Sequence, residues 1–116
     1  EGIDAPEAAQ SCLTAQGTSW PCGRRAAFAL ADRIAQTPVS CEQTGQDRYR
    51  RILARCSVGG EDLGAFMVGQ GWALAYRRYS ERYIAHEESA ARAKRGKWVG
   101  SFEAPWDWRR TRQRAR

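Results

Sequence analysis

Two carboxylates near the start of the chain have the types and the spacing that could carry out hydrolytic chemistry. Asp4 and Glu7 lie three positions apart in the run Ile3-Asp4-Ala5-Pro6-Glu7. Pro6, between them, fixes its own φ and removes one backbone N–H. A strand that ends at such a turn would hold both acids at the mouth of a sheet, where they could bind a hard cation or position a water molecule.

A cluster of arginines is the second segment with chemical potential. It runs Asp47-Arg48-Tyr49-Arg50-Arg51 and lies at the tip of an expected hairpin. Four charges at a hairpin tip are usually solvated, and that is the simpler interpretation. An arginine directed back along the strand could instead bind a phosphate through the parallel N–H groups of its guanidinium.

The hydrophobic periodicity predicts the elements that must position these residues. Two strands are expected at residues 39–43 and 51–58, joined by a turn that contains Gly45. Asp62 is the candidate N-cap of a helix. The segments with the apolar spacing and boundary residues of α-helices are residues 24–36, 62–70 and 81–95.

The four cysteines are Cys12, Cys22, Cys41 and Cys56. No two of them form a C-x-x-C pair, so their spacing does not match the usual ligand spacing of a zinc site. Their even count and local spacing predict Cys12–Cys22 and Cys41–Cys56 disulfides, and the expected hairpin would bring the second pair into reach. Disulfides would imply an oxidising compartment, such as the periplasm or the outside of the cell. Four buried free thiols in a reducing compartment are the alternative.

Length and composition predict a single globular domain. The chain has 116 residues, of which 42% are hydrophobic and 28% charged. Its longest uncharged stretches, residues 8–23 and 64–76, are too short or too polar to cross a bilayer, so no membrane segment is expected.

The positive charge is concentrated at the end of the chain. The net charge is +6, and residues 109–116 contain five arginines and no acidic residue. Residues 101–116 are therefore expected to form an irregular Trp- and Arg-rich tail. Such a tail could bind polyanions without reading their sequence, or it could simply be solvated. Its tryptophans could stack on bases, but they more often anchor such a segment to a domain.

The order of these segments resembles the staphylococcal nuclease (thermonuclease) family. Besides the acidic turn and the basic hairpin tip, the resemblance rests on Gly71-Trp72-Ala73 with Tyr76 and Tyr79, and on Gly96-Lys97-Trp98. It covers residues 1–100 and leaves residues 101–116 as a tail. It implies an α+β fold, an OB-fold β-barrel with three helices. The paired cysteines resemble those of secreted bacterial members, so the resemblance implies a secreted or periplasmic protein.

The resemblance also implies an activity, that of a calcium-dependent nuclease acting on DNA or RNA, single strands favoured, with little sequence preference. Asp4 and the backbone carbonyl of Ala5 would bind Ca²⁺. Glu7 would be the general base, and Arg51 would stabilise the charge that develops on the phosphate. The implied substrate contacts are Arg48, Tyr49, Tyr76 and Tyr79.

The chain departs from the family pattern at its beginning. Family members have roughly three strands before the acidic turn, and those strands carry another calcium-binding Asp and a second phosphate-binding Arg. Their absence here predicts an incomplete sheet with an unpaired edge, through which two chains could pair. A gene fragment, a domain completed by another chain, and a member that has lost catalysis all fit this pattern.

The sequence therefore predicts three alternative functions. The first is that of a calcium-dependent nuclease. The second is a non-catalytic OB-type module that binds nucleic acid or other polyanions, and the third is a structural fragment without a ligand. The oligomeric state is not determined by the sequence.

Overall fold

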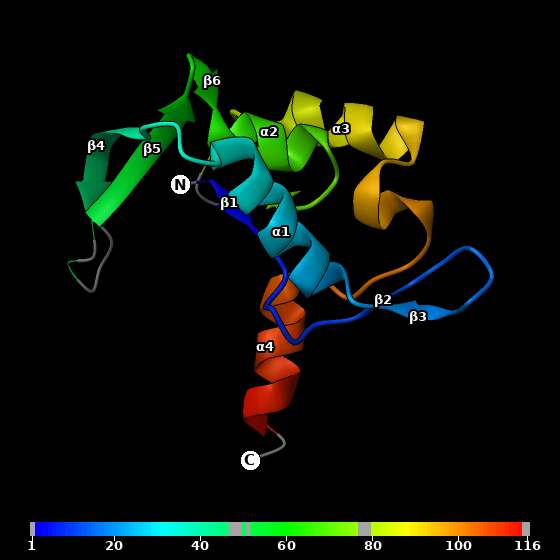
Figure 1. Ribbon diagram of the computed structural model, residues 1–116. Helices are drawn as coiled ribbons and strands as arrows, with labels where there is room; N and C mark the ends of the chain where they lie inside the picture. Colours follow the sequence, from blue (N-terminus) through cyan, green and yellow to red (C-terminus); the bar gives the residue numbers. More distant parts are fainter. Residues whose placement is uncertain (1, 47–49, 51, 77–79, 115–116) are drawn as a thin grey trace.

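The structure, a computed structural model, describes residues 2–46, 50, 52–76 and 80–114, with the backbone alone for residues 112–114. Within these residues the fold is α+β, as predicted (Figure 1). The α-helices are α1 (Cys22–Ile34), α2 (Leu63–Gly69), α3 (Ile84–Ala93) and α4 (Pro105–Arg114), with a 3₁₀ helix η1 (Gly96–Val99) before the last. The strands are β1 (Ile3–Asp4), β2 (Cys12–Leu13), β3 (Ser19–Trp20), β4 (Ser40–Gln46), β5 (Ile52–Val58), β6 (Glu61–Asp62) and β7 (Leu74–Ala75).

The three helices expected from the sequence are confirmed, with shifted boundaries. α1 begins two residues earlier than predicted, directly after Pro21. α2 is capped as expected, because the Asp62 carboxylate accepts hydrogen bonds from the backbone N–H groups of Gly64 and Ala65 at 2.7 and 3.3 Å. α3 begins at Ile84, three residues later than expected, and Tyr83 occupies its N-cap position.

The predicted hairpin is also confirmed, and its first strand is longer than expected. β4 and β5 pair antiparallel with Cys41 opposite Cys56, and a register shift between Gln43 and Gly45 lets the strand continue through the expected turn to Gln46. The tip residues 47–49 and 51 lie outside the described part. β5 also pairs with β6, which completes a three-stranded sheet.

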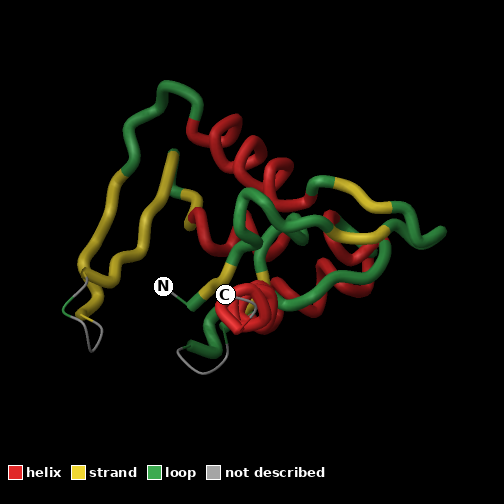
Figure 2. Tube along the Cα trace, turned by 90° about the horizontal axis from the view of Figure 1, so that it is seen from below, coloured by secondary structure: helices red, strands yellow, loops and turns green. Residues whose placement is uncertain are grey.

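The OB-fold β-barrel that the resemblance implies, with its first strands missing from this chain, is not observed as a closed barrel in the described residues. Besides the β4–β5–β6 sheet, the described part of the chain has only two two-stranded sheets, β1–β7 and β2–β3. Among these described strands, no ladder joins one sheet to another, so they do not form a continuous ring. Figure 2 shows the β4–β5 hairpin and the β2–β3 hairpin on opposite sides of the helices.

The core lies between the helices and the β1–β7 pair. Its buried members are Ala26, Met67, Val68, Ala73, Ala75 and Tyr83. The Tyr83 hydroxyl donates to the Asp62 carboxylate at 2.9 Å. The pKa of Tyr83 is raised to about 12, mainly by burial and secondly by this hydrogen bond. The same carboxylate thus caps α2 and fixes the residue at the start of α3.

The expected irregular tail is largely wrong, because residues 105–114 form helix α4. Pro105 occupies the first position of α4, where its missing N–H costs no hydrogen bond. The negative charge of Asp107, in the first turn, interacts favourably with the positive end of the helix dipole. The prediction that tryptophans anchor this segment is confirmed by the ring of Trp106, which stacks on that of Tyr76. Among the described residues, no helix is long and apolar enough to cross a bilayer.

Both predicted disulfides are present. Cys12–Cys22 joins β2 to the first residue of α1, and Cys41–Cys56 joins opposed residues of the hairpin, with Cα–Cα distances of 5.6 and 4.1 Å. The first pair is buried, with exposed fractions of 2% and 0%. Cys41 is exposed, and Cys56 is partly buried.

This difference in burial predicts the order in which the disulfides are reduced. Thiol exchange requires a thiolate to reach a sulfur atom. A mild reductant followed by alkylation should therefore label Cys41 and Cys56 before Cys12 and Cys22. Peptide mass spectrometry at successive times would measure the order. Earlier labelling of the Cys12–Cys22 pair would contradict the packing around it.

Candidate functional site

The acidic turn is held by the pairing of β1 with β7. Ile3 lies opposite Ala75 and Asp4 opposite Leu74, and the backbone N–H of Tyr76 donates to the Gly2 carbonyl at 2.8 Å. The chain then leaves the sheet through residues 5–7. The predicted arrangement, two carboxylates on a turn at the end of a strand, is therefore confirmed.

The N-terminus of α1 fixes the far side of this turn. The backbone of Gly23 packs so closely on Glu7 that a Cβ at Gly23 would lie 1.8 Å from the Glu7 carbonyl oxygen. The same carbonyl accepts a hydrogen bond from the N–H of Gln10 at 2.9 Å. Only glycine permits this approach, and the backbone of the turn is consequently held in one place.

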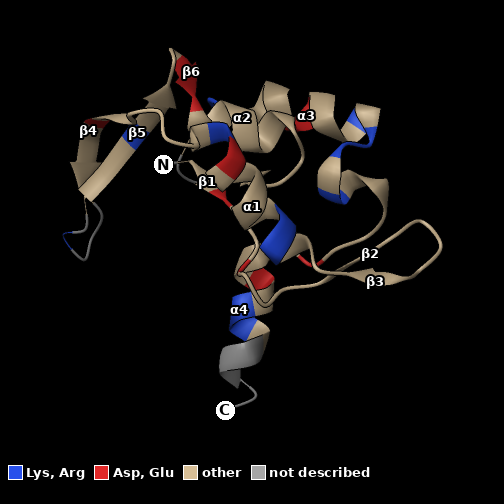
Figure 3. Cartoon of the chain, in the orientation of Figure 1, with Lys and Arg blue, Asp and Glu red and all other residues tan. Residues whose placement is uncertain are grey.

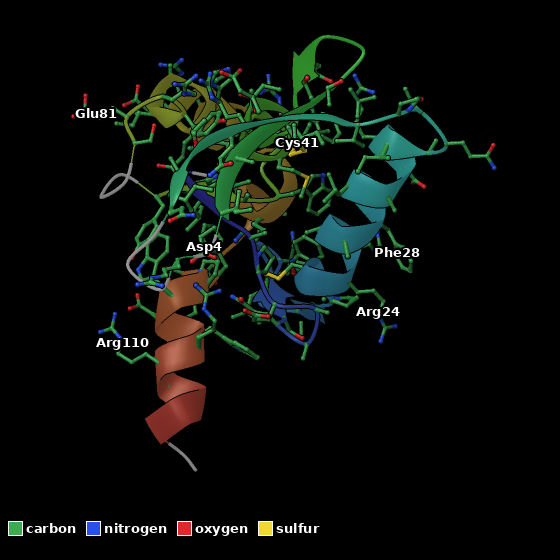
Figure 4. All side chains as sticks on the ribbon, turned by 90° about the vertical axis from the view of Figure 1, so that its left-hand side faces the viewer. Asp4, Arg24, Phe28, Cys41, Glu81 and Arg110 are labelled. Carbon is green, nitrogen blue, oxygen red and sulfur yellow. A yellow bond between two sulfur atoms is a disulfide. The ribbon has the colours of Figure 1, made fainter. Side chains whose placement is uncertain are left out.

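Arg109 of α4 bridges the two carboxylates. Its Nη2 donates to Asp4 Oδ2 at 2.5 Å, and its Nη1 donates to Glu7 Oε1 at 3.0 Å. The hydrogen bond to Asp4 is the main cause that raises the pKa of Arg109, against the opposing effect of burial. Figure 3 shows the basic residues of α4 beside acidic residues, and Figure 4 shows Asp4 above the first turns of this helix.

The same helix contacts a second candidate residue. The rings of Tyr76 and Trp106 are stacked, with centroids 5.3 Å apart and planes at 19°. α4 therefore reaches both the acidic turn and the first of the two candidate tyrosines. Sequence reasoning missed this role of α4. The signal that could have revealed it is Pro105 followed by Asp107, the pattern of a helix start.

A buried lysine interacts electrostatically with Asp4 of the acidic turn. Lys97 is 0% exposed, and its Nζ has no hydrogen-bond partner in the described part of the structure. The amine lies 4.6 Å from the centroid of the Phe102 ring. Burial lowers the pKa of Lys97 to about 8, although the charges of Asp4 and Glu87 oppose this change.

The structure brings some of the predicted site residues together and does not describe others. Asp4, Ala5 and Glu7 share the turn, and Tyr76 follows the strand paired with it. The other candidates, Arg48, Tyr49, Arg51 and Tyr79, lie outside the described residues. Their predicted contacts with substrate or phosphate stay predictions.

The carboxylate oxygens of Asp4 and Glu7 suit a hard cation chemically. Calcium takes about six to eight oxygen ligands, so these residues would provide only part of its shell. Among the described residues, no three His, Cys, Asp or Glu side chains gather in a group that could hold a metal ion. The two carboxylates are also already hydrogen-bonded to Arg109.

A comparison with protein families identifies the chain. Residues 1–100 match the model of the staphylococcal nuclease homologues. The chain belongs to the staphylococcal nuclease family. The resemblance inferred from the acidic turn, the hairpin and the Gly-x-Trp segment is thereby confirmed, and the OB-fold is the fold that this family implies.

Two of the relatives of this staphylococcal nuclease family member that follow carry nuclease names. It is 32% identical to the micrococcal nuclease of Shigella flexneri, over 97% of this chain and 67% of that protein. It is also 32% identical to an uncharacterized endonuclease of Haemophilus influenzae, over 93% of this chain and 57% of the relative. It is 38% identical to the succinoglycan biosynthesis protein ExoI of Rhizobium meliloti, over 62% of this chain and 39% of that protein. The chain thus spans about 39–67% of the length of these relatives.

The buried amine of Lys97 predicts a pH-dependent stability. The folded protein binds the Lys97 proton less tightly than the unfolded chain, with a pKa of about 8 against 10.5. Burial of the charged form therefore costs stability at and below pH 8, and that cost declines as the pH rises from 8 to 10.5. Lys97→Met should raise the free energy of unfolding at pH 7 by about 1–3 kcal/mol, and the gain should shrink at higher pH.

Urea denaturation of wild type and variant at pH 7 and pH 9.5 would measure this gain. Lys94→Met is the matched control, because Lys94 is exposed at the end of α3. A Lys97→Met variant that is less stable than wild type at pH 7 would show that the contact with Phe102 outweighs the cost of burial.

Proposed function

We propose that this chain carries the carboxylate pair of a calcium-dependent nuclease, which hydrolyses phosphodiester bonds of DNA or RNA with little sequence preference. The observation that carries the proposal is the convergence of Asp4 and Glu7 on a single guanidinium, that of Arg109. Two carboxylates that reach one cationic group can also reach one phosphodiester with its metal ion. Membership of the staphylococcal nuclease family and the names of two relatives support it.

The exposure of the two carboxylates supports different roles for them. The side chain of Asp4 is 13% exposed, and that of Glu7 is 46% exposed. Asp4, with the backbone carbonyl of Ala5, would hold Ca²⁺, which when bound supplies Lewis-acid polarisation of a phosphoryl oxygen. Glu7, which is open to solvent, would orient a water molecule and accept its proton.

The proposed reaction is an in-line hydrolysis. The water oxygen forms a bond to phosphorus while its proton passes to Glu7 Oε, and the bond from phosphorus to the leaving sugar oxygen breaks. The leaving oxygen takes a proton from solvent. Arg51 would stabilise the charge on the phosphoryl oxygens. The proposed substrate contacts are Arg48, Tyr49, Tyr76 and Tyr79, and an unstacked single strand would suit the tyrosines.

The two disulfides support an oxidising location, and we propose that the protein is secreted or periplasmic.

A second candidate function is a non-catalytic module that binds polyanions. The observation that favours it is Arg109, which already forms ion pairs with both carboxylates. Its signature would be salt-sensitive binding of nucleic acid that a chelator does not change, without cleavage.

Glu7→Gln tests the nuclease assignment. Removing the proton acceptor should lower calcium-dependent cleavage of single-stranded DNA by about 10²–10⁴-fold, while binding of the strand persists. Cleavage of a fluorescently labelled oligonucleotide, with and without a chelator, would measure the effect. Glu88→Gln is the control, because Glu88 is exposed on α3. Equal turnover in wild type and Glu7→Gln would reject Glu7 as the base.

A further inference from the structure

We propose that Arg109 of α4 acts at the acidic turn as an internal counter-ion, which a divalent cation must displace from Asp4 and Glu7. This inference rests on the proposed function, because it takes these carboxylates as cation ligands. It adds a residue outside the 1–100 segment that matches the family model. It also makes α4 part of the site.

The guanidinium of Arg109 and a bound cation would need the same oxygen atoms. Arg109 takes Asp4 Oδ2 with one nitrogen and Glu7 Oε1 with another. Charge-assisted hydrogen bonds from both arms of one guanidinium are stronger than neutral ones. A metal ion held by those oxygens would also lie within a few ångströms of the guanidinium, and the two positive charges repel.

The Arg109 side chain can leave the carboxylates while α4 stays in place. The side chain is 38% exposed, so it can rotate into solvent. The helix has other attachments. Trp106 stacks on Tyr76, Pro105 is fully buried, and Gln10 Nε2 donates to the carbonyl of Glu103, just before the helix, at 2.7 Å. Displacement therefore requires movement of one side chain rather than release of a helix.

Two positively charged side chains interact with the acidic turn. Arg109 contacts the carboxylates from α4, and the buried amine of Lys97 interacts electrostatically with Asp4 from within the fold. Lys97 cannot leave, because it is enclosed, whereas Arg109 can. Arg109 is thus the exchangeable of the two charges, and its departure would leave two carboxylates with only the enclosed amine near Asp4, a net negative charge that favours binding of a cation.

Calcium titration of the full chain by isothermal titration calorimetry tests this competition. Removal of the competing guanidinium in Arg109→Ala should tighten calcium binding by about tenfold, which is the scale of a charge-assisted hydrogen bond. Arg110→Ala is the matched control. Arg110 is the next residue of α4, its side chain is 58% exposed, and it pairs with Asp107 within the helix. The calcium affinity of Arg110→Ala should stay within about twofold of wild type, because salt screens the charge of an exposed side chain.

Two further variants identify the site and guard against misfolding. Arg109→Lys keeps the charge but lacks the fork that reaches both carboxylates, so its affinity should lie between those of wild type and Arg109→Ala. In Asp4→Asn/Arg109→Ala the gain should disappear, because the proposed ligand is missing. Urea denaturation of each variant would verify that it is folded.

The outcomes separate this inference from the proposed function. Equal or weaker calcium binding by folded Arg109→Ala, with clear binding by wild type, overturns the competition and leaves the calcium site in place. Calcium binding by neither protein overturns the calcium role itself, and with it the competition. Tighter binding that persists in Asp4→Asn/Arg109→Ala places the ion elsewhere and also overturns the proposal.

Discussion

The antiparallel pairing of β1 with β7 is the interaction on which the site depends. It joins the first residues of the chain to residues 74 and 75, and the added hydrogen bond from Tyr76 to Gly2 extends it by one step. Gly2 has a φ of 78°, and a Cβ there would lie 3.0 Å from that of Ser80, so the strand enters through a position that favours glycine. Without this pairing, the acidic turn would have no fixed relation to Tyr76 or to α4.

The rest of the fold consists of small units that hold one another in place. The sheets are short, and three of the six buried residues of the described core are alanines, Ala26, Ala73 and Ala75. An alanine buries less apolar area than a larger side chain, so these three positions contribute little to the hydrophobic stabilisation. The disulfides and the Asp62 carboxylate, which links α2 to Tyr83, add constraints that a larger core would otherwise provide.

The electrostatics of the turn follow from this packing. Asp4 lies at the end of a paired strand and is mostly buried, so its charge requires compensation. Arg109 gives it a direct partner, and Lys97 adds a charge that is confined by burial. Glu7, farther from the sheet, shares the guanidinium but stays open to solvent. Two acids of one short sequence motif therefore acquire different environments and, in the proposed hydrolysis, different roles.

The sequence by itself determined the features that depend on local spacing. The strand and turn of residues 3–7, three helices, the hairpin and both cysteine pairs all arise from residues close together in the chain, whose periodicity and turn chemistry are visible without a structure. The order of these segments was also sufficient to indicate the family.

Only the tertiary structure decided the partners of the acidic turn. Arg109 is 105 positions from Asp4, and the amine of Lys97 acquires its character from enclosure by distant segments. No local pattern encodes such contacts, because burial and pairing over that separation arise only when the whole chain has packed.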